Sequence, residues 1–339
     1  MTSNPRPGTK PEKVQCKAVT KKGVRCRNAA KSGEAFCAMH LSMQKEERRP
    51  AKEPEERFDA KDLAESLAEM QAWMKKRLRG DYEVDEWGFD EEFAELFMPL
   101  MKFLYHKYWR VTATGLENVP AEGRALLVAN HSGVLPWDGA MIIMAVREDH
   151  PQPRQVRALV LSLFFSLPFT GTMLQRIGHV QASPANSERL LNEDELCLVF
   201  PEGVKGIGKP FSRRYQLARF GRGGFVRVAL KTRSPIIPVS VVGAEEIYPL
   251  LVNLRPLASL LGVPYVPITP TFPLLGPLGA VPLPTKWYIH FGEPINIQDM
   301  TYRPSEEPLL VTKISNQVRD TIQRQIYERL KTRRSVFFE

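Results

Sequence analysis

Short apolar runs alternate with helix-like patterns throughout residues 111–339, and this alternation constrains the fold more than any other feature of the chain. The runs have the length and the β-branched content of buried strands, and they lie at 125–129, 157–161, 196–200, 236–242 and 286–291. Helical patterns follow several of them, at 138–147, 187–192, 220–231 and 314–330. Strands that alternate with helices form layered α/β domains. The sequence therefore predicts a mixed β-sheet flanked by helices over 111–339.

Two amphipathic stretches precede this domain and predict a helical segment over residues 58–110. The first, 58–78, repeats apolar residues at helical spacing. The second, 89–108, has a broader apolar stripe that Pro99 interrupts, so we expect a kinked helix there. Residues 43–57 are charged and contain two prolines, which is typical of a linker.

The net charge of +9 belongs to the N-terminal arm. Residues 1–52 hold 13 Lys and Arg against 4 Asp and Glu, whereas the remaining 287 residues hold 34 of each. With 43% hydrophobic and 25% charged residues, the composition excludes a wholly disordered, collagen-like or coiled-coil protein. The N-terminus lacks the apolar core of a secretory signal, so we expect a reducing, cytoplasmic compartment without disulfides.

Polar blocks stand where two predicted strands end. Asn130-His131-Ser132-Gly133 follows the first strand, with six residues between His131 and Asp138, and Pro201-Glu202-Gly203-Val204-Lys205 follows the run at 196–200. Residues just beyond the carboxyl ends of strands line the ligand crevice of an α/β sheet. An imidazole paired with a carboxylate can deprotonate a hydroxyl, and the chain has no Gly-x-Ser-x-Gly motif, so we expect that hydroxyl to belong to a substrate. Asp138 could instead serve only as the N-cap of the helix that follows.

The order of these blocks, with Ile236-Ile237-Pro238-Val239 and Gly243-Ala244-Glu245-Glu246 after them, resembles the glycerophospholipid (lysophospholipid) acyltransferases. The resemblance covers roughly residues 109–297 and is closest to the mono- and diacylglycerol acyltransferase-like branch. It implies a glycerol-phosphate acyltransferase-like fold and transfer of an acyl group from a coenzyme A or acyl carrier protein thioester to a glycerolipid hydroxyl. It also implies that His131 is the general base, Asp138 its partner, and Glu202, Gly203 and Lys205 the acceptor contacts.

The acceptor stays open because two blocks depart from the family pattern. Six residues separate His131 from Asp138 where the family has four, and Val204-Lys205 replaces the usual Thr-Arg. A lysophospholipid such as 1-acyl-glycerol-3-phosphate is the first expectation, and a neutral mono- or diacylglycerol or a long-chain alcohol is the alternative. Arg213 and Arg214, in a run of nine cations within 202–233, are predicted phosphate ligands. Because a thioester is already activated, no catalytic cofactor is expected.

The first 42 residues form a separate basic module with three of the four cysteines. Cys16, Cys26, Cys37 and His40 supply three thiolates and an imidazole, a set suited to tetrahedral zinc, and the run resembles small Cys3His zinc-knuckle modules. We expect structural zinc here, against the alternative of a disordered basic tail. The module leaves open a function of another class, a non-catalytic lipid-binding adaptor. Only this arm supports nucleic-acid binding, so nucleic acid is not expected as a partner.

Two uncharged stretches, 158–175 and 256–285, bear on membrane contact. The first contains Pro168 and Gly171, and the second contains eight prolines, so neither has the pattern of a spanning helix. For 256–285 we favour a hydrophobic channel or a membrane-docking surface over simple packing. The sequence therefore predicts a peripheral enzyme at the cytoplasmic face of a membrane.

Overall fold

The computed structural model describes residues 15–18, 24–31, 34–40, 75–77, 79–254, 258, 266–297, 300 and 306–338. The chain divides into two compact units, Met1–Gly80 and Asp81–Glu339. The predicted linker at 43–57 lies outside the described residues, and so does the helix expected at 58–78, apart from 75–77, which are helical. Among the helices of the described ranges, none is long and apolar enough to cross a membrane.

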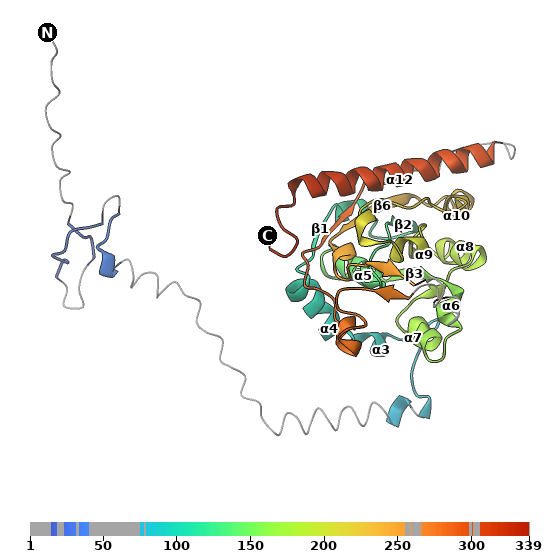
Figure 1. Ribbon diagram of the computed structural model, residues 1–339, viewed down its shortest axis with the longest axis horizontal. Coiled ribbons are helices and arrows are strands. Elements are labelled where there is room, and N and C mark those ends of the chain that lie inside the picture. Colours follow the sequence, from blue (N-terminus) through green and yellow to red (C-terminus); the bar gives the residue numbers. More distant parts are fainter. Residues whose placement is uncertain are drawn as a thin grey trace, which may run out of the picture. The chain divides into compact units, whose positions relative to one another are not determined.

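The larger unit is built on a seven-stranded sheet in the order β1-β9-β6-β2-β5-β3-β4 (Figure 1). All neighbours pair in parallel except β6 and β9, which are antiparallel. The strands are β1 (Thr112–Thr114), β2 (Ala125–Ala129), β3 (Val156–Val160), β4 (Val180–Gln181), β5 (Leu196–Val199), β6 (Ile236–Val242) and β9 (Tyr288–Phe291). This architecture confirms the predicted mixed α/β fold. The short strands β1 and β4 were not expected from the sequence.

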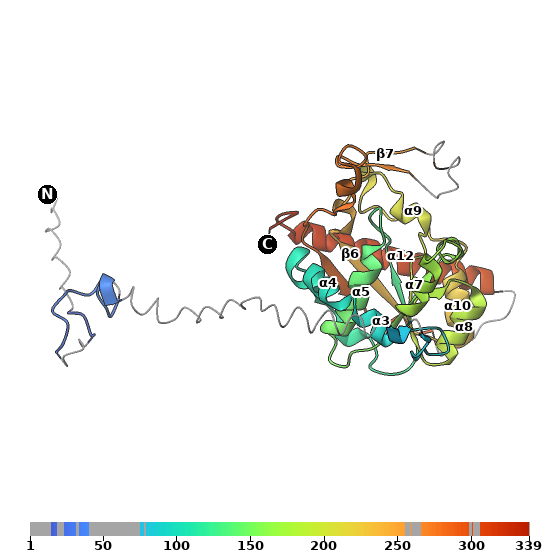
Figure 2. The ribbon, with the colours of Figure 1, turned by 90° about the horizontal axis from the view of Figure 1, so that it is seen from below.

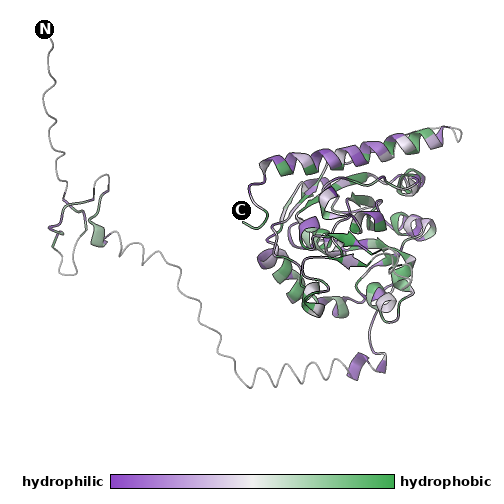
Figure 3. Ribbon diagram, viewed as in Figure 1, coloured by the Kyte–Doolittle hydropathy of each residue, from purple (hydrophilic) through white to green (hydrophobic). Residues whose placement is uncertain are grey.

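Helices cover both faces of the sheet, which is why the central strands β2 and β6 are buried throughout and almost entirely apolar. Along β2, Leu127 and Ala129 point into one core, whereas Leu126 and Val128 point into the other. The first core lies under α5 (Trp137–Glu148), and the second under α8 (Pro184–Asn192), α10 (Gly224–Thr232) and α12 (Glu307–Thr332). In Figure 3, α12 alternates between hydrophilic and hydrophobic residues, as expected for a helix that lies along the sheet with one face in solvent.

The stretch 89–108 forms three short helical pieces: α3 (Glu91–Glu95), α4 (Met98–Lys102) and the π-helical turn η1 (Phe103–Tyr108). Pro99 lies in the first turn of α4, where its missing N–H costs no helical hydrogen bond. Leu104 and Tyr105 are buried in the same core as α5, and Trp109 stacks on Trp287 with 4.7 Å between ring centroids. The stretch that the sequence places in a separate helical segment therefore shares the core of the sheet domain.

Shorter elements complete the unit, at α6 (Ser162–Phe165), α7 (Thr170–Arg176), α9 (Val204–Ile207), η2 (Leu116–Asn118), η3 (Phe211–Arg213) and η4 (Ala244–Glu246). Between β6 and β9, the described residues 250–254, 258 and 266–282 make a small lobe, named here the β7–β8 lobe. It contains the antiparallel pair β7 (Val252–Asn253) and β8 (Pro267–Ile268) and the turn η5 (Gly276–Ala280). Figure 2 shows this lobe projecting from the body on the side of α9.

Candidate active site

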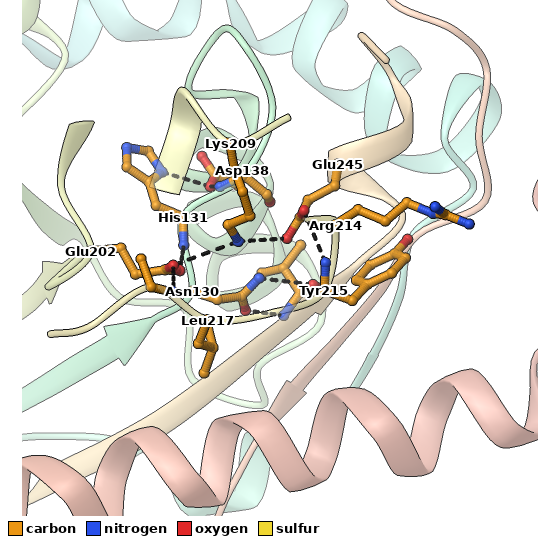
Figure 4. Close-up of polar contacts among 12 residues, drawn as sticks. Asn130, His131, Asp138, Glu202, Lys209, Arg214, Tyr215, Leu217 and Glu245 are labelled. Carbon is orange, nitrogen blue, oxygen red and sulfur yellow. Dashed lines mark hydrogen bonds and ion pairs between the residues drawn. The ribbon is translucent and has the colours of Figure 1, made fainter. Parts of the chain in front are cut away.

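Polar residues that follow three neighbouring strands meet at one edge of the sheet (Figure 4). β2 lies between β5 and β6 and runs parallel to both, so the carboxyl ends of all three strands face the same edge. His131 follows β2, Glu202 follows β5 and Glu245 follows β6. Residues more than 100 positions apart in the chain are thereby brought into one cluster.

Asn130 fixes the start of the loop that carries His131. Its buried side chain accepts a hydrogen bond from the Val241 N–H at 2.7 Å and donates one to the Val241 carbonyl at 3.0 Å. An amide side chain has both the acceptor and the donor that these two bonds need. Asn130 was not among the predicted site residues, although its position directly after a buried strand and before a candidate base is a usable signal.

His131 and Asp138 form a closely bonded pair. His131 Nδ1 lies 2.7 Å from Asp138 Oδ2, and the same oxygen accepts the Ser132 N–H at 2.8 Å. The Asp138 side chain is fully buried, and that of His131 is 12% exposed. A carboxylate held this way assigns the ring proton to Nδ1 and leaves the Nε2 lone pair as the basic atom. Nε2 has no hydrogen-bond partner in the part of the chain that the structure describes, so it is available to take a proton.

The geometry also answers whether Asp138 serves only as a helix cap. The N-cap of α5 is Pro136, and Asp138 lies in the first turn, where its Oδ1 accepts the Gly139 N–H at 2.9 Å. A carboxylate at this end of a helix is stabilised by the helix dipole. Asp138 thus satisfies a helical N–H with one oxygen and holds His131 with the other, across the six intervening residues.

Close packing sets the plane of the imidazole. The His131 ring stacks on Phe200, the residue after β5, with 4.2 Å between centroids and 22° between planes. On another side, a Cβ added to Gly206 of α9 would lie 2.7 Å from His131 Cβ and 2.8 Å from its carbonyl oxygen. Only glycine allows α9 to approach the histidine this closely.

Glu202 is buried beneath the loop that carries His131 and does not face open solvent. Its side chain is fully buried, and its two oxygens accept the His131 N–H at 3.0 Å and the Ala218 N–H at 2.5 Å. The family resemblance implies a direct contact between Glu202 and the acceptor. In the structure both of its oxygens are committed to backbone groups, so its carboxylate orients His131 through the main chain.

Lys209 lies between the carboxylates of Glu202 and Glu245. Its Nζ lies 3.5 Å from Glu202 Oε2 and 3.1 Å from Glu245 Oε1, and its side chain is 7% exposed (Figure 4). Glu245 also accepts the Tyr215 N–H at 3.0 Å. The sequence does not distinguish Lys209 from the other cations of the run at 202–233, because nothing local shows which of them will be buried.

Glu245 predicts a pH dependence of stability. Burial raises the pKa of its carboxyl from 4.5 to about 7, even though Lys209 and the Tyr215 N–H favour the charged form. The folded protein therefore binds this proton more tightly than the unfolded chain does. The resulting stabilisation is complete below pH 4.5 and is lost as the pH rises through 7, a difference of about 3 kcal/mol in the free energy of unfolding.

Urea unfolding across this pH range should show the decline in the free energy of unfolding for wild type and a flatter profile for Glu245→Gln. The exposed control Glu122→Gln should keep the wild-type slope, and equal slopes in all three proteins would refute the assignment.

A cleft of about 460 Å³ opens beside the cluster. Lys205 and Arg213 line it and are exposed, and Asn253 of the β7–β8 lobe forms part of its wall. Lys209 also lines it, but its charge is shared with two carboxylates. Among the residues that the structure describes, Lys205 and Arg213 have no ion-pair partner, so the cleft presents these two cations to a ligand.

Two other predicted contacts lie differently. Gly203 precedes α9 with a φ of +54° and makes the turn from β5 into that helix. Arg214 does not line the cleft, because its guanidinium lies 4.4 Å from the Phe211 ring and donates to the Phe211 carbonyl. The structure thus brings Lys205 and Arg213 together and directs Arg214 to a neighbouring surface.

In the N-terminal unit, the predicted metal ligands converge. The side-chain donor atoms of Cys16, Cys26, Cys37 and His40 all lie within 4.8 Å of one another. His40 Nδ1 is 3.3 Å from Cys37 Sγ and 3.7 Å from Cys16 Sγ. All three cysteines are buried, and the set could hold a metal ion.

Comparison with known proteins places this geometry in context. A family model described as Acyltransferase matches residues 110–242. The uncharacterized protein Rv0502 of Mycobacterium tuberculosis is 49% identical over 278 residues, which cover 82% of this chain and 78% of that protein. The chloroplastic phytyl ester synthase 2 of Arabidopsis thaliana is 32% identical over 137 residues, 39% of this chain and 19% of that protein. Among solved structures, the 1-acyl-sn-glycerophosphate acyltransferase PlsC of Thermotoga maritima matches with 19% identity and a TM-score of 0.46, over 72% of this chain and 80% of that one.

The matched family segment runs from just before β1 to the end of β6, so it contains the His131–Asp138 pair and Glu202. A base of this kind, without a serine elbow, suits transfer of an acyl group to a hydroxyl supplied by a substrate. The chain therefore belongs to the acyltransferase family and is an O-acyltransferase.

Proposed function

We propose that the protein transfers a fatty acyl group from a coenzyme A or acyl carrier protein thioester to a glycerolipid hydroxyl. The preferred acceptor in this proposal is 1-acyl-glycerol-3-phosphate or a related lysophospholipid. The observation that carries the proposal is the 2.7 Å bond between His131 Nδ1 and Asp138 Oδ2 at the carboxyl edge of the sheet, next to a cleft with two uncommitted cations.

The geometry suggests a direct transfer. His131 Nε2 removes the proton of the acceptor hydroxyl as its oxygen attacks the thioester carbonyl, and Asp138 stabilises the imidazolium that forms. The tetrahedral intermediate collapses with cleavage of the C–S bond, and the imidazolium returns its proton to the departing thiolate. The products are an ester and a free thiol, and no redox partner is required.

The cleft supplies the contacts for an acceptor phosphate. Lys205 and Arg213 are exposed on its wall and can neutralise a phosphate monoester, the lysine as a point charge and the arginine through its planar fork. Glu202 and Gly203 contribute by positioning His131 and α9 rather than by touching the acceptor. Arg214 lies outside the cleft and is left out of this role.

A neutral acceptor is the second candidate, and two observations favour keeping it. The third cation of the cleft, Lys209, is engaged by Glu202 and Glu245, so the positive charge offered to a phosphate is small. The partial relative from Arabidopsis thaliana is named for synthesis of a phytyl ester, the ester of a long-chain alcohol. Mono- or diacylglycerol and long-chain alcohols therefore belong in the same assay.

The test is thiol release from acyl-coenzyme A donors with lysophosphatidate, monoacylglycerol, diacylglycerol or a long-chain alcohol as acceptor, and with His131→Ala as the blank. Acceptor-dependent release that the variant lacks would establish the chemistry. Preference for the phosphorylated acceptor, with a raised KM in Arg213→Gln, would support the first candidate, whereas a neutral preference unaffected by that change would support the second. Absence of release with both coenzyme A and carrier-protein donors would refute acyl transfer and favour a lipid-binding adaptor.

We further propose that Cys16, Cys26, Cys37 and His40 hold one structural zinc ion. Donor atoms around a tetrahedral zinc lie about 3.3–3.8 Å apart, close to the separations seen between His40 Nδ1 and the Cys37 and Cys16 sulfurs. Four protein ligands leave no position for a substrate, and the apolar core around the cysteines is small, so the metal would mainly stabilise the fold of this module.

Metal analysis of the purified protein should find about one zinc per chain. Cys37→Ser should lose it, because a hydroxyl is a much poorer ligand than a thiolate, whereas Cys197→Ser, which changes the buried cysteine of β5, should retain it. A metal-free wild-type protein prepared under reducing conditions, or a full zinc content in Cys37→Ser, would overturn the proposal.

For the site of action, we propose the cytoplasmic face of a membrane, where a peripheral enzyme meets both a soluble thioester and a lipid acceptor. Support comes from the class of reaction, since long-chain acceptors reside in bilayers. No role for nucleic acid is included.

A further inference from the structure

The β7–β8 lobe carries a group of leucines with little protein contact. Leu274 is 83% exposed, Leu278 is 71% exposed and Leu251 is 55% exposed. Val252 of β7, Leu275 and Val281 are also more than half exposed. Single exposed leucines are common on proteins, but several large apolar side chains exposed on one small lobe indicate an interaction surface.

The stretch of sequence that contains the lobe has exposed charges of one sign. From Gly203 to Gly292 the only acidic residues are Glu245 and Glu246, and both are buried in ion pairs, with Lys209 and Arg333 respectively. The exposed cations Lys205 and Arg213 share the wall of the cleft with Asn253 of the lobe. A surface of leucines bordered by cations, with no exposed carboxylate in this stretch of sequence, is complementary to anionic lipid headgroups over an acyl layer.

The lobe is tied to the body by specific hydrogen bonds. The Phe211 N–H, at the start of η3, donates to the Leu250 carbonyl at 2.8 Å, and the Tyr248 hydroxyl donates to the Ala280 carbonyl at 2.5 Å. The Leu283 N–H donates to the Ile247 carbonyl at 2.9 Å. The leucines are therefore carried on a lobe that is fastened to the catalytic domain at both of its ends.

The residues just before the lobe contact the loop that carries His131. A Cβ added to Gly133, two residues after His131, would lie 3.4 Å from Ile247 Cδ1 and 3.2 Å from the Ala244 carbonyl oxygen. Leu135 in the same loop is 41% exposed. A membrane or protein surface bound to the lobe would therefore lie close to the loop that carries His131.

We propose that the β7–β8 lobe, with Lys205 and Arg213 at its base, is the surface by which this enzyme docks on an anionic bilayer. Leu274 and Leu278 enter the interface between headgroups and acyl chains, and the cations meet lipid phosphates. The proposal rests on the proposed function, because it explains how the catalytic loop meets an acceptor that does not leave the membrane. A second copy of the chain is the competing occupant, and the test below separates the two.

The experiment is flotation of the full-length protein with phosphatidylcholine vesicles that contain or lack phosphatidylglycerol. Wild type should bind the anionic vesicles, and added salt should weaken binding. Leu274→Ser/Leu278→Ser should reduce vesicle binding by roughly tenfold or more for each leucine, from the loss of apolar surface that enters the interface. The matched control is Leu309→Ser, which alters a leucine of α12 that is 78% exposed and lies outside the lobe, and it should bind as wild type does.

Two further readouts keep the outcomes distinct. Thermal unfolding should be unchanged in the double variant, because neither leucine packs in a core, and activity on a short-chain, water-soluble acceptor should also be unchanged. Activity on vesicle-embedded acceptor should fall with binding. Equal vesicle binding by wild type and the double variant would overturn the docking proposal, and so would a dimer that only the double variant loses. Binding that depends on the leucines in a protein without acyl transfer would refute the proposed function and leave the docking surface standing.

Discussion

Replacement of His131 by alanine is expected to lower kcat for acyl transfer by roughly 10²–10⁴-fold, the usual contribution of a positioned general base. The reason is geometric: Nε2 is the basic atom of the only imidazole bonded to a buried carboxylate at this edge of the described sheet. KM for the acceptor should change little, because the proton is transferred in the transition state. Thiol release under saturating donor and acceptor measures the effect.

Asp138→Asn provides the companion variant. An asparagine keeps the size, but only one of its two terminal atoms can accept a hydrogen bond, whereas N–H groups face both oxygens of Asp138. The amide NH2 must oppose either the Gly139 N–H or the His131 Nδ1 and Ser132 N–H groups, and the negative charge that stabilises the imidazolium is lost in both orientations. A loss comparable to that of His131→Ala is expected. The two losses should not add in the double variant, because the residues act as a unit. His106→Ala, which changes an exposed histidine on η1, is the control and should keep full activity. Near-wild-type turnover in either site variant would refute the proposed base.

Lys209→Met should destabilise the folded protein by about 3–5 kcal/mol, the usual cost of removing one partner from a buried ion pair. The lysine ammonium lies between Glu202 and Glu245, and none of the three side chains is more than 7% exposed. Its loss leaves two buried carboxylates without a counter-charge. Activity should fall as well, because Glu202 holds the His131 N–H and an unbalanced carboxylate in that position will shift or take up a proton.

The matched control is Lys205→Met, the same substitution at an exposed lysine four positions earlier. It should leave the urea midpoint within experimental error while raising KM for a phosphorylated acceptor. Adding Glu245→Gln to Lys209→Met should recover part of the lost stability, since one uncompensated charge is then removed. Equal urea midpoints for Lys209→Met and Lys205→Met would show that the buried cluster contributes nothing to stability.

The strand and motif pattern was sufficient to predict the centre of the fold. The five expected strands occur within two residues of their predicted bounds, because central strands of a covered parallel sheet are apolar on both faces and stand out as short runs. The His131 and Glu202 blocks could be assigned to one edge because parallel strands end at the same side of a sheet. β1 and β4 could not be found in this way, since edge strands of three and two residues have no periodicity to detect.

The role of each residue within the site was harder to predict, because it depends on whether the folded protein buries that side chain. Glu202 and Lys205 look alike as polar residues after a strand, yet one is buried beneath the catalytic loop and the other is exposed on the cleft. Asn130 acts through its contact with Val241, and Gly206 acts through its contact with His131. Each is a single contact between residues far apart in the chain, so it produces no periodic pattern in the sequence.

For this chain, the sequence was enough to determine the α/β class and to predict which strand ends carry polar blocks, and it offered His131 and Asp138 as a candidate pair. The strands themselves follow from side-chain periodicity, which is local, and the shared edge of their polar ends follows from the general rule that strands alternating with helices pair in parallel. The tertiary structure alone decided which carboxylates and which lysine are buried together, which cations remain open to a ligand, and that residues 89–108 complete the core of the sheet. These depend on desolvation and on contacts between residues up to about 180 positions apart, such as Trp109 and Trp287, and only the folded chain brings such residues together.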